Sequence, residues 1–360
     1  MKFFTRIDRY IMAKFLGTYF LAIALIISIA VVFDISEKMD NFFEHNAPLN
    51  AIVFDYYLNF IPYFANLFSP LFVFIAVIFF TSKMAENTEI IAILASGVSF
   101  KRMMFPYFVS ALLIASLTFY LNGYVIPEDN ITRLKFENQY VKVRDASYAR
   151  NIQMELEPGV VAYLERFEKK TNMGYSFSLE KFNGKTLVSR LTAQHIKYDS
   201  LNHWKISNYI IRNFNEKSEE MFRGTEKDTI IAMEPSDFFV TKNMQEQMTN
   251  PELKHYIDKQ KKRGIGNLKE FELEYHKRFA SPFAAFILTL IGVSLSSEKK
   301  RGGIGLNIGV GLTLSFSYIL FTTISSTFAI QSSMSPFLAV WLPNLTFIPI
   351  AFFLYRNTPK

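Results

Sequence analysis

Long runs of residues without a single Asp, Glu, Lys or Arg constrain this sequence more than any other feature. A helix needs about 20 mainly apolar residues to cross the hydrocarbon core of a bilayer. Several stretches near both ends of the chain meet that requirement, while the middle is polar. The uncharged runs are residues 15–33, 56–82, 103–127, 279–297 and 302–355.

The last run is too long for one crossing. It divides at Ser335-Pro336, where a polar residue and a proline favour a turn. This gives spans at 302–330 and 336–355, and six membrane-spanning helices in all. The first span has no small-x-small cleavage site before Asp34, so we expect a retained helix rather than a signal peptide.

Positive charge beside the spans predicts their orientation, because Lys and Arg gather on the cytoplasmic side. The short loops on the other side hold Lys38 alone. Both termini are therefore expected in the cytoplasm, and the central segment in the periplasm of a bacterial inner-membrane protein. The net charge of +7 then reflects topology, not nucleic-acid binding. The basic residues are Lys2, Arg6, Arg9, Lys14, Lys83, Lys101, Arg102, Lys299, Lys300, Arg301, Arg356 and Lys360.

The central segment, residues 128–278, has the pattern of an antiparallel β domain. Short runs rich in β-branched and aromatic residues alternate with turn residues, with no helix between them. Such a pattern favours a sandwich, jelly roll or open barrel. We expect a type I′ turn at Asn183-Gly184 and helices after Pro251. The expected strands are 160–164, 175–179, 185–191, 204–211 and 229–233.

The sequence contains no catalytic or metal-binding motif with the residues and spacing that its chemistry requires. There is no cysteine, and the five histidines have no metal-ligand spacing. Gly184-Lys185-Thr186 resembles the end of a phosphate-binding loop, but Leu179 replaces the required first glycine. The spans also lack the ionisable group that a proton-coupled carrier needs. We therefore expect no enzyme activity, no metal and no cofactor, and any transport energy has to come from another subunit.

The loop between the second and third spans reads Ser-Lys-Met-Ala-Glu-Asn-Thr-Glu-Ile-Ile-Ala-Ile-Leu-Ala-Ser-Gly-Val-Ser at 82–99. It predicts a short helix at about 86–96 that ends at Gly97, with Ser99 as the N-cap of the next span. A partner protein could cover its apolar residues.

This loop resembles the coupling helix of the LptF/LptG lipopolysaccharide export permeases. Ile7-Asp8-Arg9-Tyr10 is similar to the opening of the LptG branch, and Tyr275 to Pro282 to the entry of the fourth helix. The span layout is also similar. The resemblance implies membrane helices 1–3 at 1–127, a periplasmic β jelly roll with flanking helices at 128–278, and helices 4–6 at 279–360.

The resemblance also implies a role. Two such permeases sit on an LptB-like ATPase dimer, extract lipopolysaccharide from the inner membrane, and pass it to LptC- and LptA-like periplasmic proteins. Glu89 is the main expected contact with the ATPase, followed by Glu86, and Ile90, Ile93, Leu94 and Gly97 complete that segment.

Three further sets of residues are expected to meet the lipid or the second permease. Gly305 and Gly309 form a small-xxx-small pair on a gate helix. The Lys that LptG-type proteins use for lipid phosphate aligns with Asp34, so Lys38, one turn later, is the substitute. The acyl-chain path is expected at Val160, Tyr163, Phe177, Leu179, Leu187 and Ile210.

Two alternatives remain open on the sequence. The chain could export another envelope lipid with the same architecture, or it could be a membrane scaffold or sensor without a transport role. A co-purifying ATPase favours a transporter, and the identity of a bound lipid separates the two transporters.

Overall fold

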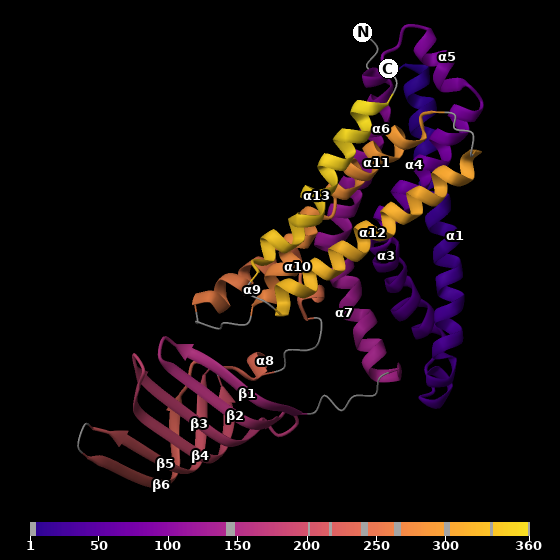
Figure 1. Cartoon of the computed structure of the whole chain (residues 1–360). Coiled ribbons are helices and arrows are strands. Elements are labelled where there is room, and N and C mark those ends of the chain that lie inside the picture. The colour runs from indigo at the N-terminus through magenta and orange to yellow at the C-terminus, as the bar shows by residue number, and fades with distance from the viewer. Residues whose placement is uncertain are drawn as a thin grey trace. The chain divides into compact units, whose positions relative to one another are not determined.

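A computed structural model describes residues 5–141, 148–200, 202–215, 218–238, 244–262, 268–298, 303–331 and 334–358. They divide into two compact units (Figure 1). The helical unit holds residues 1–142, 245–253 and 269–360, and the β unit holds 143–244 and 254–268. Lys2, Lys299, Lys300, Arg301, Gly302 and Lys360, which were used to predict the topology, lie outside the described residues.

The first span is a single helix, α1, Arg6–Glu44. It begins with a capping box in which the Thr5 hydroxyl accepts from the Asp8 N–H and the Asp8 carboxylate accepts from the Thr5 N–H. The helix extends beyond the predicted 15–33 on both sides, because the polar residues that flank the apolar run continue its hydrogen bonding.

The second predicted span, 56–82, is divided. A short α2, Leu49–Ala51, leads through a π-helical turn at Ile52–Tyr57 into α3, Leu58–Leu67, and then α4, Ser69–Glu86. The break falls at Phe68, just before Pro70, whose ring nitrogen has no hydrogen to continue the preceding helix. Only α4 is long and apolar enough to be a span by itself.

The third span continues into the polar sequence after it. Helix α5, Glu89–Ala95, precedes α6, Phe100–Tyr120. A π-helical segment at Leu121–Val125 joins α6 to α7, Ile126–Phe136, and a second one follows at Glu137–Val141. The run from Phe100 to Val141 is helical throughout, so the third span ends well beyond the predicted position 127.

The last three spans follow the prediction more closely. Helices α10, Lys269–Ala280, and α11, Phe283–Ser296, meet at a 46° bend at Ser281-Pro282. Then come α12, Gly303–Gln331, and α13, Pro336–Asn357. Five described helices could cross a membrane, and the bent pair α10–α11 makes a sixth.

Polar side chains join the spans at several buried points. Tyr318 of α12 donates to the Asn344 Oδ1 of α13 over 2.8 Å, and Asn344 Nδ2 donates to the Ala280 carbonyl at the end of α10. Asn307 of α12 donates to the Ser82 hydroxyl of α4. Such bonds supply helix association where apolar contact with lipid and with protein is equally favourable.

The β unit is one six-stranded antiparallel sheet in which each strand pairs with the next along the chain. The expected helical fold with an antiparallel β domain inserted between its helices is thus confirmed. The strands are β1 Tyr148–Glu157, β2 Val160–Glu168, β3 Met173–Asn183, β4 Thr186–Ser200, β5 His203–Phe214 and β6 Glu219–Ile230. Short helical elements follow at α8 Pro235–Phe238, Met244–Gln247 and α9 Asn250–Lys262.

Both edge strands differ from the prediction. β1 was not predicted, although Ile152, Met154 and Leu156 alternate along it towards the apolar cluster of the sheet. β6 was placed at 229–233, but it begins at Glu219 and ends at Ile230. Its side chains are mostly exposed on both faces, so it lacks the alternation that reveals a half-buried strand.

A crease crosses the sheet. One exposed residue per strand, Asn151, Glu165, Ser176, Gln194, Asn208 and Thr225, has no cross-strand register partner. Three of them, Asn151, Ser176 and Asn208, have a positive φ between 51° and 54°. The buried residues therefore change parity across the crease, from Leu164 to Phe167 in β2 and from Ala193 to Ile196 in β4.

The β3–β4 hairpin corrects one prediction by a residue. Asn183 pairs with Thr186, so Gly184 and Lys185 are the central turn residues, and Gly184 has a φ of +62°. Only Gly184 of the expected Asn183-Gly184 pair has positive φ, so the type I′ assignment is wrong. The sequence Gly184-Lys185-Thr186 is accordingly a hairpin turn and not a phosphate-binding loop.

We expect Gly311→Leu to destabilise the helical unit by about 1–3 kcal/mol, the usual cost of overpacking. A Cβ on Gly311 would lie 2.1 Å from the Ile78 Cδ1 of α4, a side chain that is itself fully packed. Thermal unfolding of the detergent-solubilised chain measures the effect. Gly309→Leu is the matched control on the same helix, since a Cβ there meets nothing within 4 Å. Equal melting temperatures for the two variants would contradict the packing of α12 on α4.

Candidate functional site

The segment expected to meet an ATPase is organised around α5. Thr88, at φ +60°, separates α5 from α4, so the expected helix at about 86–96 is shortened and Glu86 ends α4 instead. Gly97 has a φ of +88° and its N–H donates to the Leu94 carbonyl, which ends the helix as predicted. Ser99 caps α6 by accepting from the Arg102 N–H, also as predicted.

The apolar face of α5 is partly covered by this chain itself. Ile90 is 2% exposed and belongs to the core formed by α1, α4, α6 and α11, with Ile93 and Leu94 packed against it. Ile90 is therefore covered by this chain itself and not left for a partner protein. Ile91, which is 58% exposed, remains uncovered.

Glu89 is held from two sides. Its carboxylate accepts from the Tyr10 hydroxyl of α1 over 3.0 Å and from Asn87 Nδ2 over 3.3 Å. Two residues before Tyr10, Asp8 receives two parallel hydrogen bonds of 2.7 and 2.6 Å from the Arg102 guanidinium of α6. The start of α1, the segment with α5 and the start of α6 are thus joined by side-chain contacts.

A hollow of about 380 Å³ lies beside the C-terminal end of α5. It is bordered by Leu94, by residues 97–101 and by Tyr355 of α13, whose ring lies 5.9 Å from that of Phe100. The start of α1, the end of α13 and α5 all lie at one end of the helical unit (Figure 1).

The glycines expected at a gate face away from the rest of the chain. An added Cβ on Gly305 or Gly309 would meet nothing within 4 Å, and both residues are exposed. Asn307, between them, is 3% exposed and bonds to Ser82. The surface of α12 that carries Gly305 and Gly309 is therefore open in this chain, and the close approach to α4 is made by Gly311, which the sequence reasoning missed.

Lys38, the expected phosphate contact, is already paired. Its ammonium lies 2.6 Å from the Asp34 carboxylate and also contacts the Tyr56 hydroxyl. Tyr57 donates to the other Asp34 oxygen over 3.1 Å. The side chains of Lys38 and Asp34 are only 18% and 13% exposed, so this pair presents little net charge to an approaching anion.

The acyl-chain residues fall on both faces of the sheet. Phe177 and Leu179 belong to the apolar cluster, and Val160 lies on the same face by the alternation of its strand. Leu187 pairs with Phe182 beyond a bulge at Val188, which turns it to the opposite face. Tyr163 and Ile210 lie on the other face. They belong to one cross-strand row, in which Tyr163 is beside Ser178, Ser178 beside Thr192, and Thr192 beside Ile210. The set expected from the sequence is therefore not one surface.

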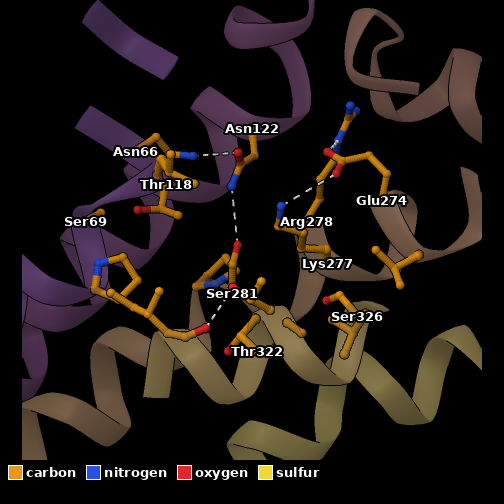
Figure 2. A pocket seen from close by; sticks show the side chains of 18 of the residues that line it. Asn66, Ser69, Thr118, Asn122, Glu274, Lys277, Arg278, Ser281, Thr322 and Ser326 are labelled. Atoms are coloured by element: carbon orange, nitrogen blue, oxygen red, sulfur yellow. Dashed lines mark hydrogen bonds and ion pairs between the residues drawn. The ribbon is translucent and has the colours of Figure 1, made fainter. Parts of the chain in front are cut away.

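A second cavity, of about 340 Å³, lies among α3, α4, α6, α10, α12 and α13. Figure 2 shows a chain of polar side chains across it, in which Asn66 donates to Asn122 and Asn122 donates to Ser281. Sequence reasoning missed this site, although asparagines inside otherwise apolar spans were a readable signal.

Arg278 supports one side of this cavity (Figure 2). Its guanidinium is 2% exposed and donates to the Glu274 carboxylate, the carbonyls of Gln245 and Met248, and Asn250 Oδ1. Burial raises the pKa of the neighbouring Glu246 carboxyl above its usual value, and the negative charge of Glu274 raises it further.

Comparison with known proteins identifies the family. The sequence profile of the lipopolysaccharide export system permease LptF/LptG matches residues 9–357. This chain belongs to the LptF/LptG permease family. A search of curated proteins gives no match. The LptF/LptG assignment agrees with the apolar helices and the antiparallel sheet between them, and it makes the chain a member of a transporter permease family rather than an enzyme family.

In this LptF/LptG chain we expect Arg102→Met to lower the stability of the α1–α6 contact by about 1–3 kcal/mol, because Asp8 would lose its charged donor while its side chain stays 3% exposed. Thermal unfolding in detergent measures the loss. Arg9→Met, an exposed residue on the next position of α1, is the control and should melt like the parent. A parent-like Arg102→Met would show that the ion pair contributes nothing.

Proposed function

We propose that this chain is a permease subunit of an ABC transporter that extracts lipopolysaccharide from the bacterial inner membrane. The observation that carries the proposal is the family match over residues 9–357, together with a short helix at the family's coupling position. Glu89 of that helix bonds to Tyr10 of the first span, and its Ile90 is packed in the core of the helical unit. ATP is hydrolysed by a separate LptB-like dimer, and a second LptF/LptG-type permease completes the membrane part.

The proposed orientation follows the positive charges. Both termini and α5 lie in the cytoplasm, and the β domain lies in the periplasm, where it passes the lipid to LptC- and LptA-like proteins. Residues 1–127 hold the first three spans, 128–278 the periplasmic part and 279–360 the last three. The placement of α5 at the same end of the helical unit as the start of α1 and the end of α13 supports this orientation.

The chain takes the LptG role in this proposal. The stretch that resembles the LptG branch is Ile7-Asp8-Arg9-Tyr10. Two of its residues make contacts that hold the helices together. Asp8 caps α1 and binds Arg102, while Tyr10 holds Glu89. Because Tyr10 contacts Glu89, a displacement of the ATPase contact would be transmitted through this motif to α1.

Closure of the ATPase would push on α5 through Glu89, with Glu86 as a second contact and the hollow beside Leu94 and Gly97 receiving a side chain of the partner. Because Ile90 is part of the core of the helical unit, α5 transmits that movement to α1, α4 and α6 and does not swing alone. The open surface with Gly305 and Gly309 faces the second permease and opens or closes a lateral gate.

The lipid's phosphate and acyl groups have different sites in this proposal. To bind a phosphate, Lys38 would have to leave its ion pair with Asp34. A phosphate with two negative charges can displace Asp34 more readily than a neutral headgroup can. The acyl chains follow the apolar face of the sheet at Phe177 and Leu179, together with Val160. Leu187 lies on the opposite face and is removed from the path. Tyr163 and Ile210, on the opposite face, are removed from the path.

We expect Glu89→Arg to reduce co-purification of the ATPase by more than about tenfold, because charge reversal at an interface costs several kcal/mol. Glu89→Gln keeps an acceptor for Tyr10 and should give an intermediate loss. The measurement is the amount of ATPase that co-purifies with the tagged chain from its own host, and the ATP hydrolysis of the complex. Glu44→Arg, at the other end of α1, is the matched control. Full recovery of an active complex with Glu89→Arg would contradict the coupling role.

A photo-crosslinking amino acid at Leu179 should capture lipopolysaccharide in an ATP-dependent manner, and the same residue at Tyr163 should not, because the two positions lie on opposite faces of the sheet. The products are separated by gel and detected through the lipid. Equal capture at both positions would contradict a path along one face. Capture of another lipid at Leu179 would favour the same-architecture exporter, and purification of the chain with no ATPase would favour a scaffold.

A further inference from the structure

The polar cavity of the helical unit contains hydrogen-bond acceptors that the chain leaves unused. Glu246 Oε2 and Asn66 Oδ1 both line it, are buried, and have no hydrogen-bond partner among the described residues. A buried acceptor without a donor costs free energy. Two such acceptors in one cavity indicate a ligand, or water, that supplies hydrogen-bond donors.

The charges around the cavity show what such a ligand must carry. Arg278 is fully occupied by four acceptors, including Glu274. Lys277 is 45% exposed and reaches Glu274 only at 4.0 Å. Lys277 and Arg278 also attract the Glu246 carboxylate, although neither donates a hydrogen bond to its Oε2. The four charged residues of the lining, Glu246, Glu274, Lys277 and Arg278, therefore balance in charge. A ligand with a single charge would upset that balance, whereas a zwitterion keeps it.

The surroundings of the cavity point to a lipid as the source of that zwitterion. Its lining includes Leu67 and Ile330, which are 47% and 41% exposed on helices of the membrane-crossing unit, and the exposed Thr323 and Thr327 of α12. The cavity therefore reaches the lateral surface, where bilayer lipids lie. Its volume of about 340 Å³ is near the lower end of ligand pockets, which suits a headgroup and not a whole lipid.

We propose that this cavity binds the headgroup of a phosphatidylethanolamine-type phospholipid. The ammonium donates hydrogen bonds to Glu246 and Asn66, the phosphate lies towards Lys277, and the acyl chains leave between Leu67 and Ile330. Because an ethanolamine ammonium has N–H donors and a choline has none, the site distinguishes these two zwitterions. An anionic glycerol headgroup has hydroxyl donors, but it adds a net negative charge beside Glu246 and Glu274. The site does not depend on the transported substrate, and it would hold α3, α10 and α12 together around the lipid.

Native mass spectrometry of the full chain tests this proposal. The protein is exchanged into micelles that contain equal amounts of phosphatidylethanolamine, phosphatidylcholine and phosphatidylglycerol. We expect one retained phosphatidylethanolamine per chain, with about tenfold preference over each of the other two, the factor that one charge-assisted hydrogen bond supplies. Soluble phosphoethanolamine should compete weakly, because it lacks acyl chains. Retention of the three lipids in equal amounts would overturn the proposal.

Variants identify the cavity as the site. Glu246→Gln should reduce the preference for phosphatidylethanolamine over phosphatidylcholine, since the ammonium then donates to a neutral amide oxygen and its hydrogen bond loses the assistance of the negative charge. Lys277→Gln should weaken both lipids alike. Glu270→Gln and Lys135→Gln, exposed residues of α10 and α7 outside the cavity lining, are the charge-matched controls.

Ser326→Leu provides a second, independent variant that fills the cavity from α12 and leaves its charged groups in place. It should expel phosphatidylethanolamine, while a parent-like melting temperature shows that the fold is kept. Unchanged retention in both Ser326→Leu and the Glu246→Gln/Lys277→Gln double variant would show that the lipid binds elsewhere. Binding of soluble phosphoethanolamine as tightly as the lipid would identify a water-soluble ligand and overturn the lipid assignment.

Discussion

The guanidinium of Arg278 fixes how the chain returns to its helical unit. Its four hydrogen bonds go to acceptors on α10 and on residues 245–250, so the segment that precedes α10 is tied to that helix at one point. Removing the guanidinium would take a hydrogen-bond donor from the Glu274 carboxylate and from the carbonyls of Met248 and Gln245, which lowers stability where water has little access. The polar cavity, the bend between α10 and α11, and the Asn344 contact to Ala280 are all built beside this clamp.

The opposite end of the same unit is organised by a different kind of contact. There the charged and polar groups join three segments that are adjacent in space but distant in sequence, through Asp8 with Arg102 and Tyr10 with Glu89. Arg102 is 41% exposed, so solvent screens part of its attraction to Asp8. A half-exposed contact of this sort can be rearranged by a partner, whereas the Arg278 clamp cannot be rearranged without large cost.

The sequence was sufficient for the features that depend on local chemistry. Uncharged length revealed the spans, Gly97 revealed the end of the loop helix, Ser99 revealed the start of the next span, and alternating strands revealed most of the sheet. The features that it did not reveal depend on which face of a helix or strand meets which neighbour. Gly311 and Gly309 look alike in sequence, yet only Gly311 packs against α4. Lys38 looks available until Asp34 and Tyr56 are seen beside it.

The crease in the β sheet has a consequence for how a hydrocarbon chain could move along it. In β2 and β4 one exposed residue at the crease shifts the alternation of buried and exposed side chains by one position. The apolar side chains on both sides of the crease therefore stay on one face of the sheet. This apolar surface therefore continues across the bend without a polar residue on that face between its two parts. On one side of the crease that surface is covered by Phe238, which packs on Phe167 and Trp204. An acyl tail that followed the surface around the bend would therefore have to displace this cover, so the turn of the sheet is where passage costs most.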